Sequence, residues 1–184
     1  MGNRGILHDD ARHVLRSWQV RRWLACRTEF RGRKRSVMRP HSYTELFFLD
    51  EATALGAGHR PCAECRHADY QRFRSLWEAR YGPQVSADLI DVKLHADRLD
   101  ERKKRTYEED LAALPEGTYV AVDRIAWLVW QGALFAWSST GYARWYPRPA
   151  HLQVDVLTPR STVELLRDGY VPGVHPSVDA KRFA

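Results

Sequence analysis

The chain has 184 residues, 44% of them hydrophobic and seven of them Trp, and its 29 Lys and Arg outnumber 23 Asp and Glu for a net charge of +6. This length predicts one domain, or one domain with a small appendage, and the hydrophobic content argues against a disordered chain. No run of about 18 apolar residues is present, which argues against a membrane span. Residues 1–10 lack the apolar core of a signal peptide, and three cysteines cannot all pair with one another. We therefore expect a cytoplasmic protein with reduced thiols and no membrane partner.

Basic charge is concentrated in the first part of the chain. Residues 1–107 contain 22 basic and 14 acidic side chains, a balance of +8, whereas residues 108–184 contain 7 and 9, a balance of −2. We expect a basic module over 1–107 and an aromatic-rich β module over 108–184, with the boundary near residues 108–116. A basic surface is compatible with nucleic-acid binding and equally with a plain solvated surface.

The N-terminal module is predicted to begin with strands. Residues 9–24 fit either a short helix or a strand. Residues 25–30 and 33–38 flank Arg31-Gly32, which is typical of a hairpin, and residues 43–49 indicate a third strand.

Two helices are predicted next. The first covers residues 51–57, with Asp50 in the N-cap position and Gly58 just beyond its end. The second covers residues 66–81 and ends at Gly82-Pro83. Apolar residues recur along it at spacings of 3, 4 and 4, which predicts one buried face: Tyr70, Phe73, Trp77 and Tyr81.

A third helix, residues 86–105, is predicted to have an apolar and a polar face. The apolar face consists of Leu89, Val92, Ala96 and Leu99, and the polar face of Asp88, Asp91, His95, Arg98 and Arg102. Asp91 lies one turn before His95 and could orient its imidazole, which makes this pair a candidate general base or supported metal ligand. A solvated helix face with ordinary ion pairs gives the same pattern, and we favour that interpretation.

The C-terminal module is predicted to be mostly β. Residues 118–123, 125–130 and 133–137 are short apolar runs separated by tight turns, which predicts an antiparallel meander with Trp127 and Trp130 on opposite faces. A loop, a strand over residues 152–157, a helix over about 160–168 and an irregular tail follow. Ser161 and Glu164 suggest a capping box, and Gly169 suits the helix end. The predicted fold class is α+β.

The most specific motif is Cys62-Ala63-Glu64-Cys65. Two thiolates at this spacing can bind one tetrahedral Zn²⁺, and the helix that follows stabilises their charge. A redox CxxC motif also precedes a helix, but it usually follows a strand in a βαβ unit, which is absent here. Cys26 lies upstream, where zinc modules often place further ligands. We therefore predict a zinc site that includes Cys26, Cys62 and Cys65.

Residues 47–65 resemble the zinc-binding domain of the Ada alkylation-repair proteins. The matching positions are Gly58, Arg60, Pro61, Cys62 and Cys65, with Cys26 at the upstream cysteine site, and the resemblance covers about residues 23–70. It implies a zinc-stapled module of a kind that also accompanies bacterial nucleases. The family binds zinc through four cysteines, but Phe30 stands where the second upstream cysteine would be, so methyl transfer by such a centre is not expected.

The missing fourth ligand leaves several alternatives. His95 and His59 rank equally, His41 and His13 rank behind them, and an open position that holds water would make the zinc catalytic. Two basic clusters are candidate phosphate contacts, and they consist of Arg31, Arg33, Lys34 and Arg35 and of Arg102, Lys103, Lys104 and Arg105.

The leading hypothesis is a zinc-binding protein that engages nucleic acid and in which zinc is mainly structural. One alternative is a hydrolase, such as a phosphodiester-cleaving nuclease, that uses an open zinc or His95 with Asp91. A second alternative is a zinc-stapled protein-interaction module.

Overall fold

The computed structural model describes residues 1–33 and 36–182. Its helices and strands, in chain order, are β1 Gly2–Asn3, β2 Leu24–Ala25, α1 Glu51–Gly56, β3 Arg60–Pro61, α2 His67–Tyr81, α3 Ala87–Arg98, β4 Leu99–Asp100, β5 Lys103–Lys104, β6 Tyr107–Asp110, the 3₁₀ turn Leu111–Ala113, β7 Tyr119–Val122, β8 Ile125–Trp130, β9 Ala133–Ser138, β10 Gly141–Pro147, β11 Gln153–Val156, α4 Arg160–Arg167 and α5 Ser177–Arg182. This content confirms the α+β class. No helix in the described ranges is long and apolar enough to cross a lipid bilayer.

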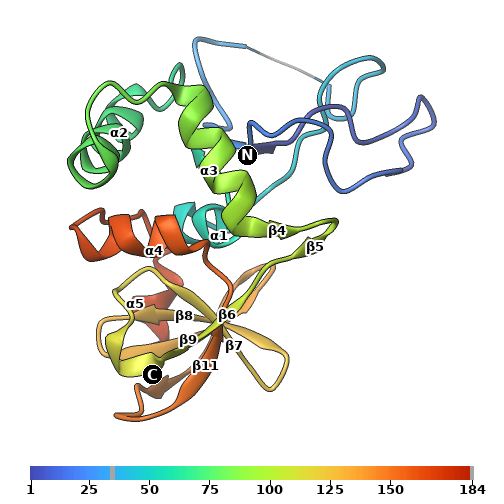
Figure 1. Ribbon diagram of the computed structural model, residues 1–184. Helices are drawn as coiled ribbons and strands as arrows, with labels where there is room; N and C mark the ends of the chain where they lie inside the picture. The colour runs from blue at the N-terminus through green and yellow to red at the C-terminus, as the bar shows by residue number, and fades with distance from the viewer. Residues whose placement is uncertain (34–35, 183–184) are drawn as a thin grey trace.

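The elements form layers around one large sheet (Figure 1). Six antiparallel strands lie in the order β10-β9-β8-β7-β11-β6. Helices α1 and α4 lie between this sheet and the α2–α3 pair, and the N-terminal loops lie beside α3 (Figure 1). A second, three-stranded sheet, β1-β2-β3, belongs to the N-terminal part and carries the cysteines on its ends.

The predicted meander is confirmed as β7, β8 and β9. Trp127 packs in the core on one face of the sheet, whereas Trp130 packs against the cluster on the other face. The segment after β9 was predicted to be a loop, but it forms β10. The loop was predicted partly because of Pro147, but β10 lies at the edge of the sheet, where a proline is tolerated. The tail also differs from the prediction, since it ends in α5, whose Val178 is buried against the sheet.

The two parts predicted from the charge pattern share a core. One cluster joins Leu55, Phe73 and Ile90 from the first part to Leu165 and Tyr170 from the second. Helix α4 supplies the junction because its Val163 packs on the sheet while its Leu165 packs on the α2–α3 pair.

Most predicted helix ends are confirmed. The Asp50 side chain accepts the Thr53 N–H at 2.7 Å as the N-cap of α1. Gly58, Gly82 and Gly169 follow their helices with φ of +88°, +104° and +101°. The Ser161 capping box is wrong, because α4 starts at Arg160 and the Ser161 hydroxyl is buried inside the helix without a partner among the described residues.

The predicted faces of the third helix are wrong. Leu89 and Val92 are 60% and 48% exposed, although both were assigned to the apolar side. The buried side of α3 instead contains Ile90, Asp91, Leu94 and Arg98. The helix also ends at Arg98, and the short hairpin β4–β5 follows it.

The hairpin predicted around Arg31-Gly32 is absent as a strand pair. The tight turn exists, since the Arg33 N–H donates to the Phe30 carbonyl at 3.1 Å, but the described flanking residues form loops. The third predicted strand is reduced to one bridge between Leu46 and Gly2. These loops are rich in exposed arginine and have few apolar side chains to bury, so packing does not stabilise a ladder there.

Candidate metal centre

Strand pairing brings the distant cysteine to the knuckle, which we define as residues 62–65. Strands β2 and β3 pair in parallel with Ala25 opposite Pro61, and the Cys62 N–H donates to the Ala25 carbonyl at 3.0 Å. Cys26 and Cys62 follow directly after these paired residues. The backbone register of two short strands therefore places two thiols side by side that are far apart in the sequence.

The three thiols form one compact group of free cysteines. The sulfurs of Cys26, Cys62 and Cys65 all lie within 4.8 Å of one another. The Arg27 N–H donates to the Cys65 sulfur at 3.3 Å. Helix α2 begins two residues after the knuckle, so its positive end lies near the sulfurs. This arrangement can hold a metal ion.

The thiols share protons unequally. The pKa of Cys62 is lowered to about 5, mainly by a hydrogen bond from the Cys26 thiol and also by the backbone N–H groups of Cys65 and Glu64. The same bond and burial raise the pKa of Cys26, and burial raises that of Cys65. Cys62 is therefore the first thiolate of the group, and a metal ion would displace the remaining protons.

No fourth ligand joins this group. Among the described residues, no further His, Cys, Asp or Glu donor atom lies within 4.8 Å of all three sulfurs. The undescribed residues are Lys34, Arg35, Phe183 and Ala184, and none of their side chains is a usual zinc ligand. His13, His41, His59 and His95 were the candidates, and all four lie outside the group.

His59 and His95 have other partners. His59 is fully buried between Trp23 and Phe48, and its Nε2 accepts the Arg4 Nε–H at 3.2 Å. Burial, followed by the nearby charges of Arg4 and Arg98, lowers its pKa well below the ordinary value. His95 lies edge-on to Trp18, and its Nδ1 accepts from Arg98 at 3.1 Å. Tertiary packing thus engages both imidazoles with partners other than the thiols.

The predicted pairing of Asp91 with His95 is wrong, and so is the favoured solvated face. Asp91 is buried and its two oxygens accept from Arg60, which is two residues before Cys62. Arg98 on the next turns of α3 donates to the carbonyls of Gly58 and Arg21. The buried face of α3 therefore holds the backbone before β2 and the segment between α1 and the knuckle, and it forms no catalytic dyad.

Two arginines at the buried face of α3 make cation–π contacts with Trp23. The guanidinium carbons of Arg4 and Arg98 lie 3.8 and 3.9 Å from the ring centroid of Trp23. Burial lowers the pKa of Arg4 to about 10 and that of Arg98 to about 9. Sequence reasoning missed this cluster. The available signal was the placement of Asp91 and Arg98 seven residues apart, beside Ile90 and Leu94 on one helix face.

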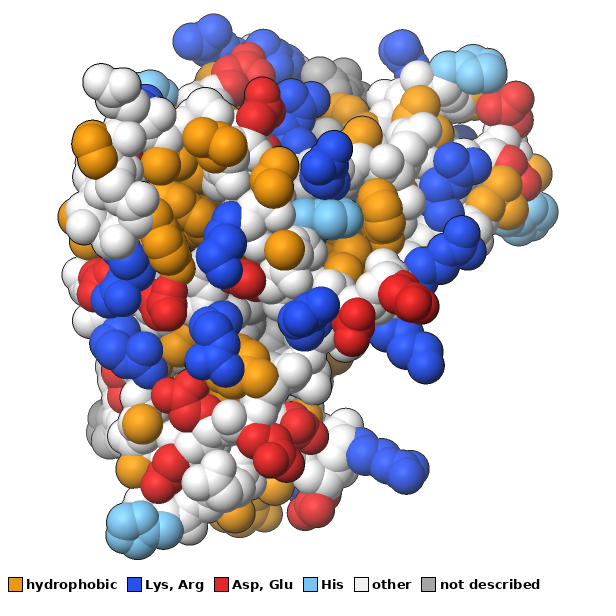
Figure 2. Space-filling view, viewed as in Figure 1, with side chains coloured by type: hydrophobic (Ala, Val, Ile, Leu, Met, Phe, Trp, Pro, Cys, Tyr) orange, Lys and Arg blue, Asp and Glu red, His pale blue; other side chains and the backbone are white. Residues whose placement is uncertain are grey.

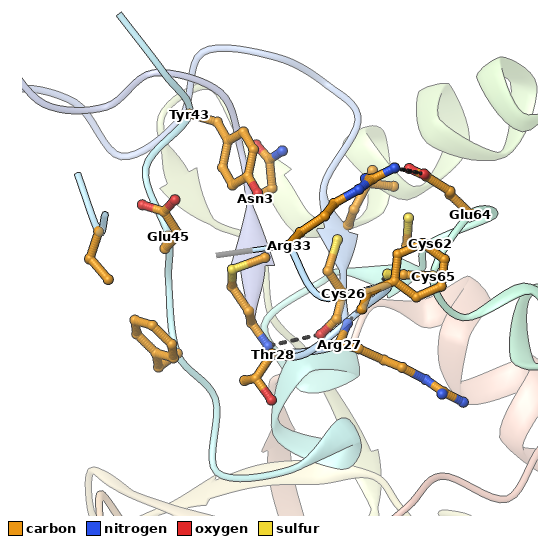
Figure 3. Close-up of a pocket in the computed structure, with 15 residues that line it drawn as sticks. Asn3, Cys26, Arg27, Thr28, Arg33, Tyr43, Glu45, Cys62, Glu64 and Cys65 are labelled. Carbon is orange, nitrogen blue, oxygen red and sulfur yellow. Dashed lines mark hydrogen bonds and ion pairs between the residues drawn. The ribbon is translucent and has the colours of Figure 1, made fainter. Parts of the chain in front are cut away.

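A pocket of about 260 Å³ opens beside the sulfurs. All three cysteines line it, and Figure 3 shows Tyr43 and Glu45 across from them on the segment before α1. Arg33 and Glu64 form an ion pair at its rim, with Arg33 Nη2 2.6 Å from Glu64 Oε1 (Figure 3). Ligands of moderate size can therefore reach a metal held by the thiols.

The predicted phosphate contacts have mixed placements. Arg31, Arg102 and Lys103 are exposed, whereas Arg33 is paired with Glu64. Lys104 donates its ammonium group to the Gly56 carbonyl at 2.9 Å, and Arg105 donates to the Leu99 carbonyl. Lys104 and Arg105 therefore each have a backbone partner within the chain, although both residues are exposed. Lys34 and Arg35 lie outside the described residues.

Further exposed arginines that were not predicted as phosphate contacts flank Cys26 in the sequence. Six of them lie between residues 12 and 39 and, like Arg31, have no carboxylate partner among the described residues: Arg12, Arg16, Arg21, Arg22, Arg27 and Arg39. In Figure 2 the basic side chains spread over the upper and middle parts of the face, and acidic ones prevail toward the bottom.

No family model, no curated protein and no solved structure matches the chain. The chemistry of the centre therefore follows from its own atoms. Three converging thiols, one of them readily ionised, provide a soft anionic donor set beside a pocket. Such a set can hold a metal ion with one coordination position left for another donor.

Proposed function

We propose that the chain is a zinc-binding protein whose basic N-terminal surface engages nucleic acid. The observation that carries this proposal is the convergence of the three sulfurs within 4.8 Å. A Zn–S bond of about 2.3 Å in tetrahedral geometry sets sulfurs about 3.8 Å apart, which falls within that limit. We also propose that residues 23–70 form an Ada-type module, with one cysteine fewer than the family pattern.

Zinc has a structural role in this proposal. It would tie Cys26, which directly follows β2, to the knuckle that follows β3. Both strands are only two residues long. Sheets this short have little hydrogen bonding of their own, and the loops of residues 26–45 bury few side chains. Metal binding would supply part of the folding free energy of this region.

The exposed arginines support the nucleic-acid part of the proposal. They lie in residues 12–39, on both sides of Cys26 in the sequence, and have no carboxylate partner among the described residues. Arginine side chains of this kind are available to phosphates, and each contact releases condensed counterions. The C-terminal module, with its balance of −2, is the less suitable surface.

Hydrolysis is the weaker alternative. A catalytic zinc needs an open position, which this centre has, but it also has to acidify a bound water. Three thiolates leave a divalent zinc with a net negative charge, which opposes the formation of hydroxide. The predicted dyad is also absent, because Asp91 is paired with Arg60 and His95 accepts from Arg98.

The metal is tested by elemental analysis of the purified protein. We expect one zinc per chain in the wild type and strongly reduced zinc in Cys62→Ser, with Ser36→Ala as a control substitution outside the knuckle. Protein that remains free of zinc after reconstitution in the presence of a reductant would overturn the proposal.

Nucleic-acid binding is tested by titrating duplex and single-stranded DNA at several salt concentrations. We expect affinity to fall with salt, and Arg21→Glu with Arg22→Glu to weaken binding at least tenfold. Arg124→Glu, on a turn of the C-terminal module, is the matched control and should have little effect. Zinc binding without any salt-sensitive DNA binding would leave the protein-interaction module as the better alternative.

A further inference from the structure

A pocket opens beside the three thiols, and a donor bound in it can reach a metal that they hold. The pocket of about 260 Å³ is lined by all three cysteines at one wall and by Tyr43 and Glu45 at the other (Figure 3). Every His, Cys, Asp and Glu of the chain belongs to the described residues, and none besides the three cysteines joins the group. A fourth donor from outside the chain can therefore complete the site.

The donor set selects the chemistry of that fourth ligand. Three thiolates form a soft site, and a fourth sulfur completes the tetrahedral four-thiolate set that zinc commonly adopts. A water at this position is poorly acidified because the centre already carries excess negative charge. A thiolate is a stronger donor and competes well with water.

The pocket has room for a small organic ligand. Its volume of about 260 Å³ accommodates an organic thiol with a short tail. Leu24, Val37 and Phe47 supply apolar wall around such a tail.

Glu45 gives the far wall a negative charge. The residue is only 9% exposed, and its Oε2 accepts the Met38 N–H at 2.9 Å. No cationic group of the described residues forms an ion pair with it. The cations that line the pocket are directed elsewhere: Arg33 pairs with Glu64, the Met1 ammonium donates to the Cys26 carbonyl at 3.0 Å, and Arg27 extends away from the sulfurs in Figure 3. An amino group on the tail of the ligand would complement this carboxylate, whereas a carboxylate on the tail would be repelled.

We propose that the thiol centre binds a small organic aminothiol, with its sulfur as the fourth metal ligand and its ammonium group toward Glu45. This inference rests on the proposed zinc site and extends it to an external ligand. Binding forms one metal–sulfur bond and releases the thiol proton to solvent, so no oxidant or reductant is needed. Glu45 is then the residue that determines specificity.

The experiment uses the full chain loaded with Co²⁺ in a buffer that contains a phosphine reductant and no thiol. Cobalt reports its ligands through visible ligand-field bands and through near-ultraviolet sulfur-to-cobalt absorption. Cysteamine, 2-mercaptoethanol and 3-mercaptopropionate are titrated separately. We expect a saturable increase in sulfur-to-cobalt absorption, with cysteamine binding roughly tenfold more tightly than 3-mercaptopropionate.

Two outcomes separate this inference from the proposed function. If the protein binds no cobalt or zinc, the metal site itself fails. If cobalt binds through three thiolates but none of the thiols changes the spectrum, the metal site stands and the external ligand is overturned.

The variant Glu45→Gln tests whether the negative charge of Glu45 determines the preference for an aminothiol. The amide oxygen of Gln can still accept the Met38 N–H, so the segment should keep its conformation, which a thermal unfolding curve checks. We expect this variant to lose the preference for cysteamine while its affinity for the uncharged 2-mercaptoethanol stays within twofold. An unchanged preference in Glu45→Gln would overturn the assignment of Glu45.

Discussion

Arg60 and Asp91 form a buried ion pair with two parallel hydrogen bonds, and this pair joins the cysteine knuckle to α3. Arg60 Nε lies 2.8 Å from Asp91 Oδ1, and Arg60 Nη2 lies 2.7 Å from Asp91 Oδ2. The two side chains are 2% and 5% exposed. Because Arg60 is in β3, two residues before Cys62, the pair ties the strand that leads into the knuckle to the helix, while β2 pairs with the same strand.

Replacing Asp91 by Asn should destabilise the fold by about 3–5 kcal/mol, because it leaves the Arg60 charge buried without its counter-charge. Urea unfolding of the zinc-loaded protein measures this loss. Asp88→Asn on the exposed face of the same helix is the control, and its effect should stay within about 1 kcal/mol. Equal and small losses in both variants would show that the buried pair does not hold the knuckle.

The sequence predicts well those features that depend on local chemistry. The N-cap at Asp50 and the left-handed glycine at position 58 follow from the needs of a helix end, and the structure has both. The β-meander follows from short apolar runs separated by turns. The three cysteines could likewise be grouped, because the spacing of Cys62 and Cys65 is typical of a metal site and Cys26 is the remaining cysteine of the chain.

The features that failed depend on contacts between distant residues. Asp91 was assigned to a solvated face because any exposed helix with ordinary ion pairs shows the same charge pattern. Its burial is favourable because Arg60, from another element, pairs with it. The environment of His59 also depends on a distant residue, because its hydrogen-bond partner Arg4 comes from the start of the chain. A sequence pattern shows neither partner, so the buried face of α3 and the engagement of His59 by Arg4 could not be derived from it.

The buried imidazole of His59 should make folding sensitive to mild acid. Burial keeps its pKa well below the ordinary value in the folded state, whereas the unfolded chain protonates near pH 6.5. The unfolded state then binds more protons, so the stabilisation is complete above about pH 6.5 and is lost as the pH falls below it. The slope approaches about 1.4 kcal/mol per pH unit.

His59→Gln tests this contribution by denaturant unfolding between about pH 5 and pH 7. Its free energy of unfolding should fall less steeply with acid than that of the wild type, by about 1 kcal/mol per pH unit. Protonation of the thiols affects both proteins and cancels in the comparison. His151→Gln, a substitution at an exposed side chain, should follow the wild-type slope. Parallel slopes for the wild type and His59→Gln would contradict the prediction.

Removal of the metal should loosen the small sheet and leave the large one intact. The Cys26 N–H donates to the Met1 carbonyl and the Cys62 N–H to the Ala25 carbonyl, so both amides report the sheet that the metal would tie together. A chelator should lower their protection from hydrogen exchange at least tenfold. Amides of β8 and β9 should change little because the large sheet has its own core. A uniform loss of protection in both sheets would argue against a local role for the metal.

Gly58 should be far less tolerant of a side chain than another glycine with a similar backbone. Gly58 has φ +88°, and a Cβ there would lie 2.7 Å from Arg98 Cδ, while Gly132 has φ +72° and open space around it. Both Gly→Ala changes carry a left-handed penalty of about 1–2 kcal/mol. Gly58→Ala should cost about 1–3 kcal/mol more, because Arg98 is held by the Gly58 carbonyl and cannot shift freely. Urea unfolding of the two variants gives the difference directly. An equal cost would show that Arg98 moves aside, and would weaken its assigned role in fixing the backbone before the knuckle.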